Sequence, residues 1–104
     1  MGKKDKRSLK SFLTPLLEHL LKRCYVSMSD CYRGWEIEIR NFRQQIVLIL
    51  QDSPSLKNFF IEILEHCYQI ALNNVKDSYP ETFFPEDFPF PIDVEEILSN
   101  KFWL

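Results

Sequence analysis

The residues of this chain that could carry chemistry are few and scattered. Its two histidines are His19 and His66, and its three cysteines are Cys24, Cys31 and Cys67. Zinc sites draw their ligands from closely spaced Cys and His pairs, and the sequence contains no such pair. The adjacent His66 and Cys67 would point in different directions on a helix. The spacing therefore predicts no metal site and, with an odd number of cysteines, no disulfide framework.

Glu62 and His66 come closest to an acid–base or metal-binding pair. Residues four apart share one face of a helix, where the two side chains could hold a proton or a metal together. No third ligand of fitting spacing lies nearby, and Gln69 and Asn73 continue the same polar strip. We interpret the strip as a solvated helix face. The alternative, a metal-dependent hydrolase, requires His19 and His66 to converge with carboxylates in the fold.

Enzyme motifs of other kinds are also missing from the sequence. The two glycines, Gly2 and Gly34, cannot form a Gly-rich phosphate loop, and no serine lies in a nucleophile elbow. We therefore expect no catalytic residue and no cofactor, and we predict that the chain is not an enzyme.

The spacing of apolar residues predicts helices over most of the chain. Apolar side chains recur at helical spacing over about residues 5–25, 31–51 and 54–77. Pro15 predicts a bend inside the first helix, because it removes a backbone N–H. Ser53 and Pro54 form a helix-start signal with the serine as cap. The sequence predicts an all-α fold, a small helical bundle of three main helices.

The segment from Trp35 to Gln51 is expected to lie at the centre of this bundle. Its apolar side chains form one stripe on a helical wheel, whereas Ile37 and Leu48 fall on the opposite side. A helix that is apolar on two sides is normally covered by neighbours on both.

From Tyr79 onward the chain becomes an arm rich in proline and phenylalanine. Four of the six prolines lie there, and they forbid a continuing helix. Its rings are too many to leave in water, so they are expected to dock on the bundle or on a partner. A short helix at about residues 93–99, capped by Asp93, and a buried Trp103 should complete a single domain over residues 1–104. The candidate partner-binding aromatic residues are Phe83, Phe84, Phe88 and Phe90.

Composition and charge limit the class of protein. Hydrophobic residues make up 45% of the chain, which is too apolar for a disordered protein. Residues 1–50 carry 10 basic and 5 acidic side chains, a net charge of +5, whereas residues 51–104 carry 3 and 10, a net charge of −7. Such a split is typical of a basic segment with an acidic partner, or of copies that attract each other.

Membrane insertion and secretion are not indicated. No run approaches the roughly 18 apolar residues of a membrane span. Pro15 and Glu18 interrupt the first apolar run, unlike the core of a signal peptide. We expect a cytoplasmic protein with reduced cysteines and no membrane contact.

Four blocks of sequence carry a resemblance to a known family. They are LLEHLLK (16–22), GWEIEIRNFRQQI (34–46), LQDSPSL (50–56) and EEILSNKFWL (95–104). In order and spacing they resemble the bacterial family called domain of unknown function 29, over nearly the whole chain. The resemblance implies an all-α fold and brings no activity or cofactor. The positions that fit the family pattern are His19, Lys22, Trp35, Arg43, Ser53, Pro54, Leu56, Phe102 and Trp103.

The resemblance also bears on assembly. Family members usually carry an acidic helix before the point where this chain begins. Without it an apolar face would be exposed, so we expect a homodimer or a higher assembly.

The function predicted from the sequence is that of a helical protein–protein interaction module without catalytic activity. The alternative is a nucleic-acid-associated or antitoxin-like regulator, whose basic N-terminal segment contacts phosphates. The candidate residues of that segment are Lys3, Lys4, Lys6 and Arg7.

Overall fold

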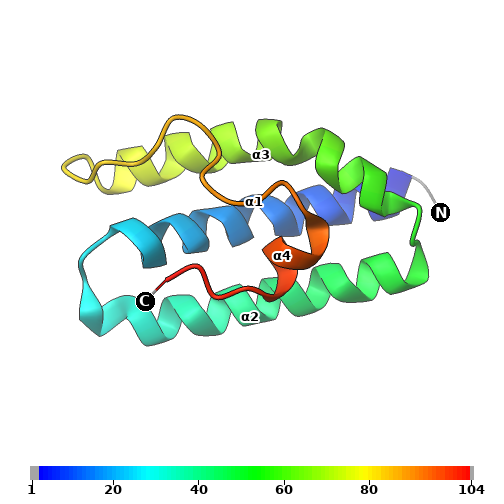
Figure 1. Ribbon diagram of the computed structural model, residues 1–104, viewed down its shortest axis with the longest axis horizontal. Helices are drawn as coiled ribbons and strands as arrows, with labels where there is room; N and C mark the ends of the chain where they lie inside the picture. The colour runs from blue at the N-terminus through cyan, green and yellow to red at the C-terminus, as the bar shows by residue number, and fades with distance from the viewer. Residues whose placement is uncertain (1–2, 104) are drawn as a thin grey trace.

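The computed structural model describes residues 3–103, and helices dominate it. They are α1 (Lys3–Tyr25), α2 (Ser29–Asp52), α3 (Leu56–Ser78) and α4 (Val94–Ser99) (Figure 1). No strand occurs between residues 3 and 103. The predicted all-α bundle of three main helices is confirmed, and its helix boundaries agree with the structure to within a few residues.

The centre of the bundle is α1, and the prediction that residues 35–51 are central is wrong. Figure 1 shows α1 between α2 and α3, and α1 packs against both. In contrast, Ile37 is 38% exposed and Leu48 is 56% exposed on α2. The apolar residues on the second side of α2 thus face outward. Six leucines of α1 are fully buried: Leu9, Leu13, Leu16, Leu17, Leu20 and Leu21.

The start of α3 differs from the prediction that Ser53 caps this helix. Helix α3 begins at Leu56, and the backbone N–H of Leu56 donates to the carbonyl oxygen of Ser53 over 3.0 Å. The Ser53 hydroxyl donates instead to Asp5 Oδ2, also over 3.0 Å. Ser53 is buried, so this hydroxyl ties the turn to the first turn of α1. The predicted Ser53 cap is wrong because α3 begins later, with Ser55 at its N-cap position and no side-chain cap hydrogen bond.

The arm after α3 crosses in front of α1 in Figure 1 and leads into α4. The ring of Phe88 lies 5.3 Å from that of Tyr68, between centroids, and 5.5 Å from that of Phe90. Both pairs are edge-to-face, the arrangement that aromatic quadrupoles favour. The Tyr68 hydroxyl donates to the Pro85 carbonyl oxygen. The arm is thus held on α3 by ring contacts and by a hydrogen bond.

Helix α4 begins as predicted. The Asp93 side chain accepts a hydrogen bond from the backbone N–H of Glu96 over 2.9 Å, which satisfies one of the free donors of the first turn. Val94 and Ile97 are buried, so this short helix turns its apolar face to the bundle, where it contacts α2 and α3. None of the helices described in the structure is long and apolar enough to cross a membrane.

Candidate protein-binding groove

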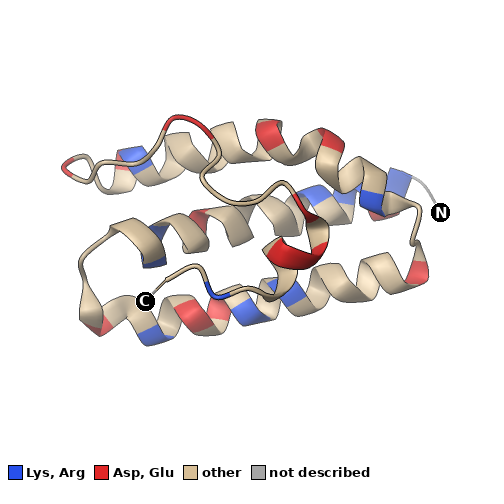
Figure 2. Cartoon of the chain, viewed as in Figure 1, with Lys and Arg blue, Asp and Glu red and all other residues tan. Residues whose placement is uncertain are grey.

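The predicted basic residues lie together on the first two turns of α1. Lys3, Lys4, Lys6 and Arg7 are exposed, and Figure 2 shows basic residues gathered at this end of the molecule. The Lys6 ammonium lies 5.0 Å from the centroid of the Phe59 ring, a cation–π distance. The structure therefore presents a small basic end.

The four predicted phenylalanines of the arm lie in different environments. Phe84 and Phe90 are 2% and 9% exposed, and Phe88 is half-buried. These three rings pack against the helical bundle of the same chain, which is the first of the two arrangements expected for the arm. Phe83 is 80% exposed at the tip of the arm. Of the four rings, Phe83 alone is accessible to a partner while the arm stays in place.

The two histidines do not meet. His19 Nδ1 lies 2.8 Å from the Pro15 carbonyl oxygen, which can only accept, so Nδ1 is the donor. Its ring packs 5.6 Å from that of Phe42 on α2, and burial lowers the pKa of His19. His66 is exposed on α3. Within residues 3–103, no group of three or more His, Cys, Asp or Glu side chains is placed to hold a metal ion.

The cysteines lie in apolar surroundings. Burial raises the pKa of Cys24 to about 11, and burial also raises the pKa of Cys67. A thiol with a raised pKa is protonated at neutral pH and is a poor nucleophile. Neither cysteine has the properties of a catalytic nucleophile.

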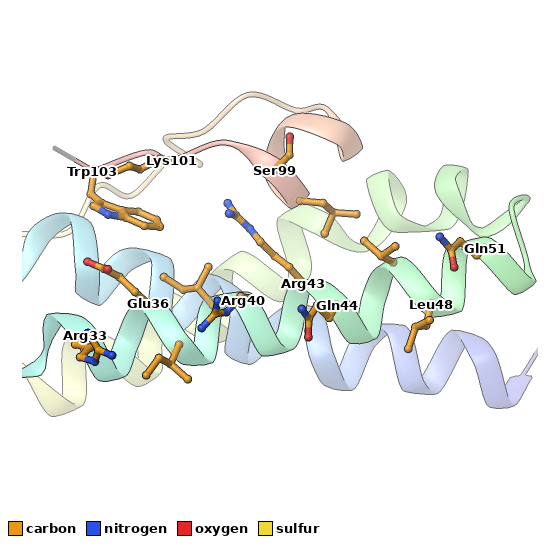
Figure 3. Close-up of a pocket in the computed structure, with 14 residues that line it drawn as sticks. Arg33, Glu36, Arg40, Arg43, Gln44, Leu48, Gln51, Ser99, Lys101 and Trp103 are labelled. Carbon is orange, nitrogen blue, oxygen red and sulfur yellow. The ribbon is translucent and has the colours of Figure 1, made fainter.

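A groove lies between α2 and residues 98–103. It has a volume of about 820 Å³ and runs along α2 (Figure 3). The sequence analysis missed this groove. Its apolar lining residues are Ile37, Ile39, Val47, Leu48, Leu98 and Trp103.

Cationic side chains outnumber acidic ones in this groove. Arg33, Arg40, Arg43 and Lys101 line it together with a single carboxylate, that of Glu36. Glu36 is itself paired, because its Oε2 lies 2.6 Å from Arg23 Nε. The groove thus combines an apolar lining with a net positive charge.

Arg43 builds one wall of the groove. Its Nε donates to the Ile97 carbonyl oxygen over 3.0 Å, and its Nη2 donates to the Asn100 carbonyl oxygen over 2.6 Å. Figure 3 shows this side chain reaching from α2 toward the C-terminal segment. Burial lowers the pKa of Arg43. The guanidinium satisfies the last carbonyls of α4, which have no partner within the helix, and fixes the segment after it.

Arg23 holds the other end of the wall. Its guanidinium carbon lies 3.8 Å from the centroid of the Tyr32 ring and 5.4 Å from that of Trp103. Trp103 is only half-buried, so the prediction that it is buried is wrong. Its ring lines the groove because the segment runs along the surface of α2 instead of entering the core.

Two pairs of positions from the family pattern are in contact. Arg43 contacts the ring of Phe102, and the Lys22 ammonium lies 5.6 Å from the Trp35 ring centroid. The molecule is therefore an all-α domain in which a C-terminal segment is tied along an outer helix. A family model matches residues 1–103, and the chain belongs to that family, the domain of unknown function DUF29. No curated protein and no solved structure gives a significant match.

Proposed function

We propose that this DUF29 protein is a cytoplasmic, non-catalytic interaction module and that the groove on α2 binds a helical segment of a protein. The observation that carries the proposal is the exposed apolar side of α2 beside the ordered residues 98–103. Leu48 is 56% exposed and Val47 and Ile37 are more than a third exposed, although all three line one groove. Covering such side chains is favourable by about 25 cal/mol per Å² of apolar area.

The groove has dimensions suited to a helix. The residues of α2 that line it extend from Arg33 to Gln51, which at about 1.5 Å per residue is about 27 Å. Amphipathic helices bind such grooves through apolar side chains at helical spacing. The cations of the groove favour acidic residues on the bound helix, because complementary charge selects the partner and speeds association.

The absence of catalysis is part of the proposal. Its supports are the donor role of His19 Nδ1 toward Pro15, the raised pKa values of Cys24 and Cys67, and the separation of His19 from His66. These arrangements supply neither a nucleophile with a base nor a paired acid and base.

The basic end of α1 supports a second candidate function, the nucleic-acid-associated or antitoxin-like regulator. Lys3, Lys4, Lys6 and Arg7 are exposed on the first two turns of α1, where they are available to contact phosphates. Phosphate contacts weaken steeply as salt rises, whereas the apolar contacts of the groove do not.

Capture of partners from native cells, with and without nuclease, tests the two functions. Leu48→Asp and Arg40→Glu alter the groove, Arg7→Glu alters the basic end, and Ile92→Asp changes an exposed apolar residue outside both. The proposal predicts a protein retained after nuclease by the wild type, Arg7→Glu and Ile92→Asp, and lost from the two groove variants. Loss with nuclease and with Arg7→Glu alone would instead establish the second function.

A further inference from the structure

Charge is unevenly distributed along the groove on α2. Figure 3 shows Arg33, Glu36 and Lys101 toward one end of the groove and Leu48 and Gln51 toward the other. All the charged side chains that line it come from residues 33–43 of α2 or from Lys101. We call these residues the cationic half. We call residues 44–51 of α2, together with Leu98, the uncharged half.

The cationic half has a net positive charge that its own carboxylate does not balance. Four cationic side chains and one carboxylate, that of Glu36, line it, which gives a net charge of +3. Within residues 3–103 none of the four cations forms an ion pair, whereas Glu36 is already paired with Arg23. The other acidic residues of α2 do not line the groove, namely Asp30, Glu38 and Asp52.

Arg43 is the half-buried member of this set. Its Nε and Nη2 donate to backbone carbonyl oxygens, which are neutral, so these bonds leave its positive charge uncompensated. Charges interact more strongly where water is partly excluded than in bulk solvent. The cationic half therefore favours a carboxylate on whatever segment covers it.

The uncharged half favours apolar side chains. Leu48 is 56% exposed and Val47 is 36% exposed, and Leu98 adjoins them from the C-terminal segment. The polar residues here are Gln44 and Gln51, which carry no charge. A carboxylate placed in this half would lose water without gaining a cation, which is unfavourable. The two halves thus select different side chains from one bound helix.

We propose that the groove binds a helical segment whose carboxylates and apolar anchors lie at opposite ends, and that this segment runs antiparallel to α2. Its carboxylates lie against Arg33, Arg40 and Lys101, and its apolar anchors cover Val47 and Leu48. The centres of the two halves of α2 are about 14 Å apart, which corresponds to about ten residues of the bound helix. This inference rests on the proposed function, because it names the chemistry and direction of the segment that the same groove binds.

Helix dipoles set the direction of the bound segment. A helix carries partial positive charge at its N-terminus and partial negative charge at its C-terminus. Helix α2 begins at Ser29, beside the cationic half, so the positive end of its dipole lies at the same end of the groove as the cations. A bound helix is therefore favoured with its C-terminus over the cationic half, which is the antiparallel arrangement.

Binding of synthetic peptides to the whole protein tests the inference. One helical peptide of about 18 residues, the length of the groove, has leucines on one face of its N-terminal half and glutamates on the same face of its C-terminal half. A second peptide has the same composition, with leucines and glutamates alternating along that face. We expect the wild type to bind the first peptide at least about tenfold more tightly.

Variants of the two halves show where the first peptide binds. Arg40→Glu and Leu48→Asp should each weaken its binding at least about tenfold, whereas Arg7→Glu, a charge reversal at the basic end of α1, should leave it unchanged. A third peptide, with lysines in place of the glutamates, should bind the double variant Arg33→Glu/Arg40→Glu more tightly than it binds the wild type. A variant that merely failed to fold could not show this gain. A photoreactive group at the N-terminus of the first peptide should label the protein near Leu48.

The outcomes separate this inference from the proposed function. Equal binding of the first two peptides, or binding of neither, would overturn the inference, and labelling near Arg33 by the N-terminal group would overturn the antiparallel direction. Capture from native cells of a protein that Leu48→Asp abolishes would still leave the proposed function standing. If no captured protein depends on Leu48, the proposed function fails, whatever the peptides show.

Discussion

Arg43 on α2 donates through Nη2 to the backbone carbonyl of Asn100 over 2.6 Å, and this bond joins residues far apart in the chain. A second bond from the same guanidinium to Ile97 makes a fork that only arginine can form. The fork positions the start of residues 98–103 along α2, and Arg23 contacts Trp103 at the other end. The groove of this DUF29 domain depends on that fork.

Replacing Arg43 by alanine should therefore loosen the C-terminal segment. We expect the free energy of unfolding to fall by about 2 kcal/mol, since hydrogen bonds from a charged group are lost and two carbonyls are left without partners. Arg43→Lys should recover only part of this. Urea denaturation measures the loss, and hydrogen exchange should show faster exchange in residues 97–103. Arg40→Ala, from an exposed position on the same helix, should change neither.

Tyr68 ties the arm to α3 through the hydrogen bond from its hydroxyl to the Pro85 carbonyl oxygen. Tyr68→Phe should lower the free energy of unfolding by about 1 kcal/mol at neutral pH, because the Pro85 carbonyl loses its donor. Tyr32→Phe removes a longer bond, 3.2 Å to the Val26 carbonyl, from a half-buried ring and is the matched control. Equal losses from the two variants would contradict a special role for Tyr68.

The same tyrosine predicts a loss of stability in alkali. Burial raises the pKa of Tyr68 above its ordinary value of 10.0. In the unfolded chain the phenol loses its proton first, so the stabilisation is complete below pH 10 and falls as the pH rises above it. Stability measured through this range should fall less steeply for Tyr68→Phe than for the wild type. Identical slopes would be evidence against the buried, protonated phenol.

His19 predicts a loss of stability in acid. Burial lowers the pKa of His19 below its ordinary value of 6.5. The unfolded state then binds the proton first, so stability is complete above pH 6.5 and falls as the pH decreases through the pKa of the folded state. We expect His19→Gln to reduce this slope. His66→Gln, at an exposed position on α3, is the comparison, and a larger change from it would refute the assignment to His19.

The sequence specified the helices well and their arrangement poorly. Apolar spacing and the Asp93 cap are local features, so the ranges of the helices and the start of α4 were predictable. The position of a helix in the bundle depends on which other helices its apolar faces contact, and the spacing of residues within one helix does not specify this. Ile37 and Leu48 suggested a second buried side of α2, whereas they are surface residues that line a groove.

The groove itself had no local signature. Its second wall comes from residues 98–103, which Arg43 ties to α2 through the Ile97 and Asn100 carbonyls, a contact between residues far apart in the sequence. The hydrogen bond from the Ser53 hydroxyl to Asp5 likewise joins residues far apart in the sequence, so no local pattern predicts it. The sequence did contain one indication of the groove, because Ile37 and Leu48 lie opposite the main apolar stripe of this helix. We interpreted these two residues as buried, whereas they are exposed.

Site-specific photo-crosslinking tests most directly the central claim, that the groove on α2 is a protein-binding surface. A photoreactive residue is placed at Leu48 in the groove or, as control, at Ile92, which is 68% exposed outside it. In native cells position 48 should give a discrete protein adduct that position 92 does not, and peptide mapping would identify the bound segment. Equal labelling at the two positions, or adducts with nucleic acid alone, would contradict the claim.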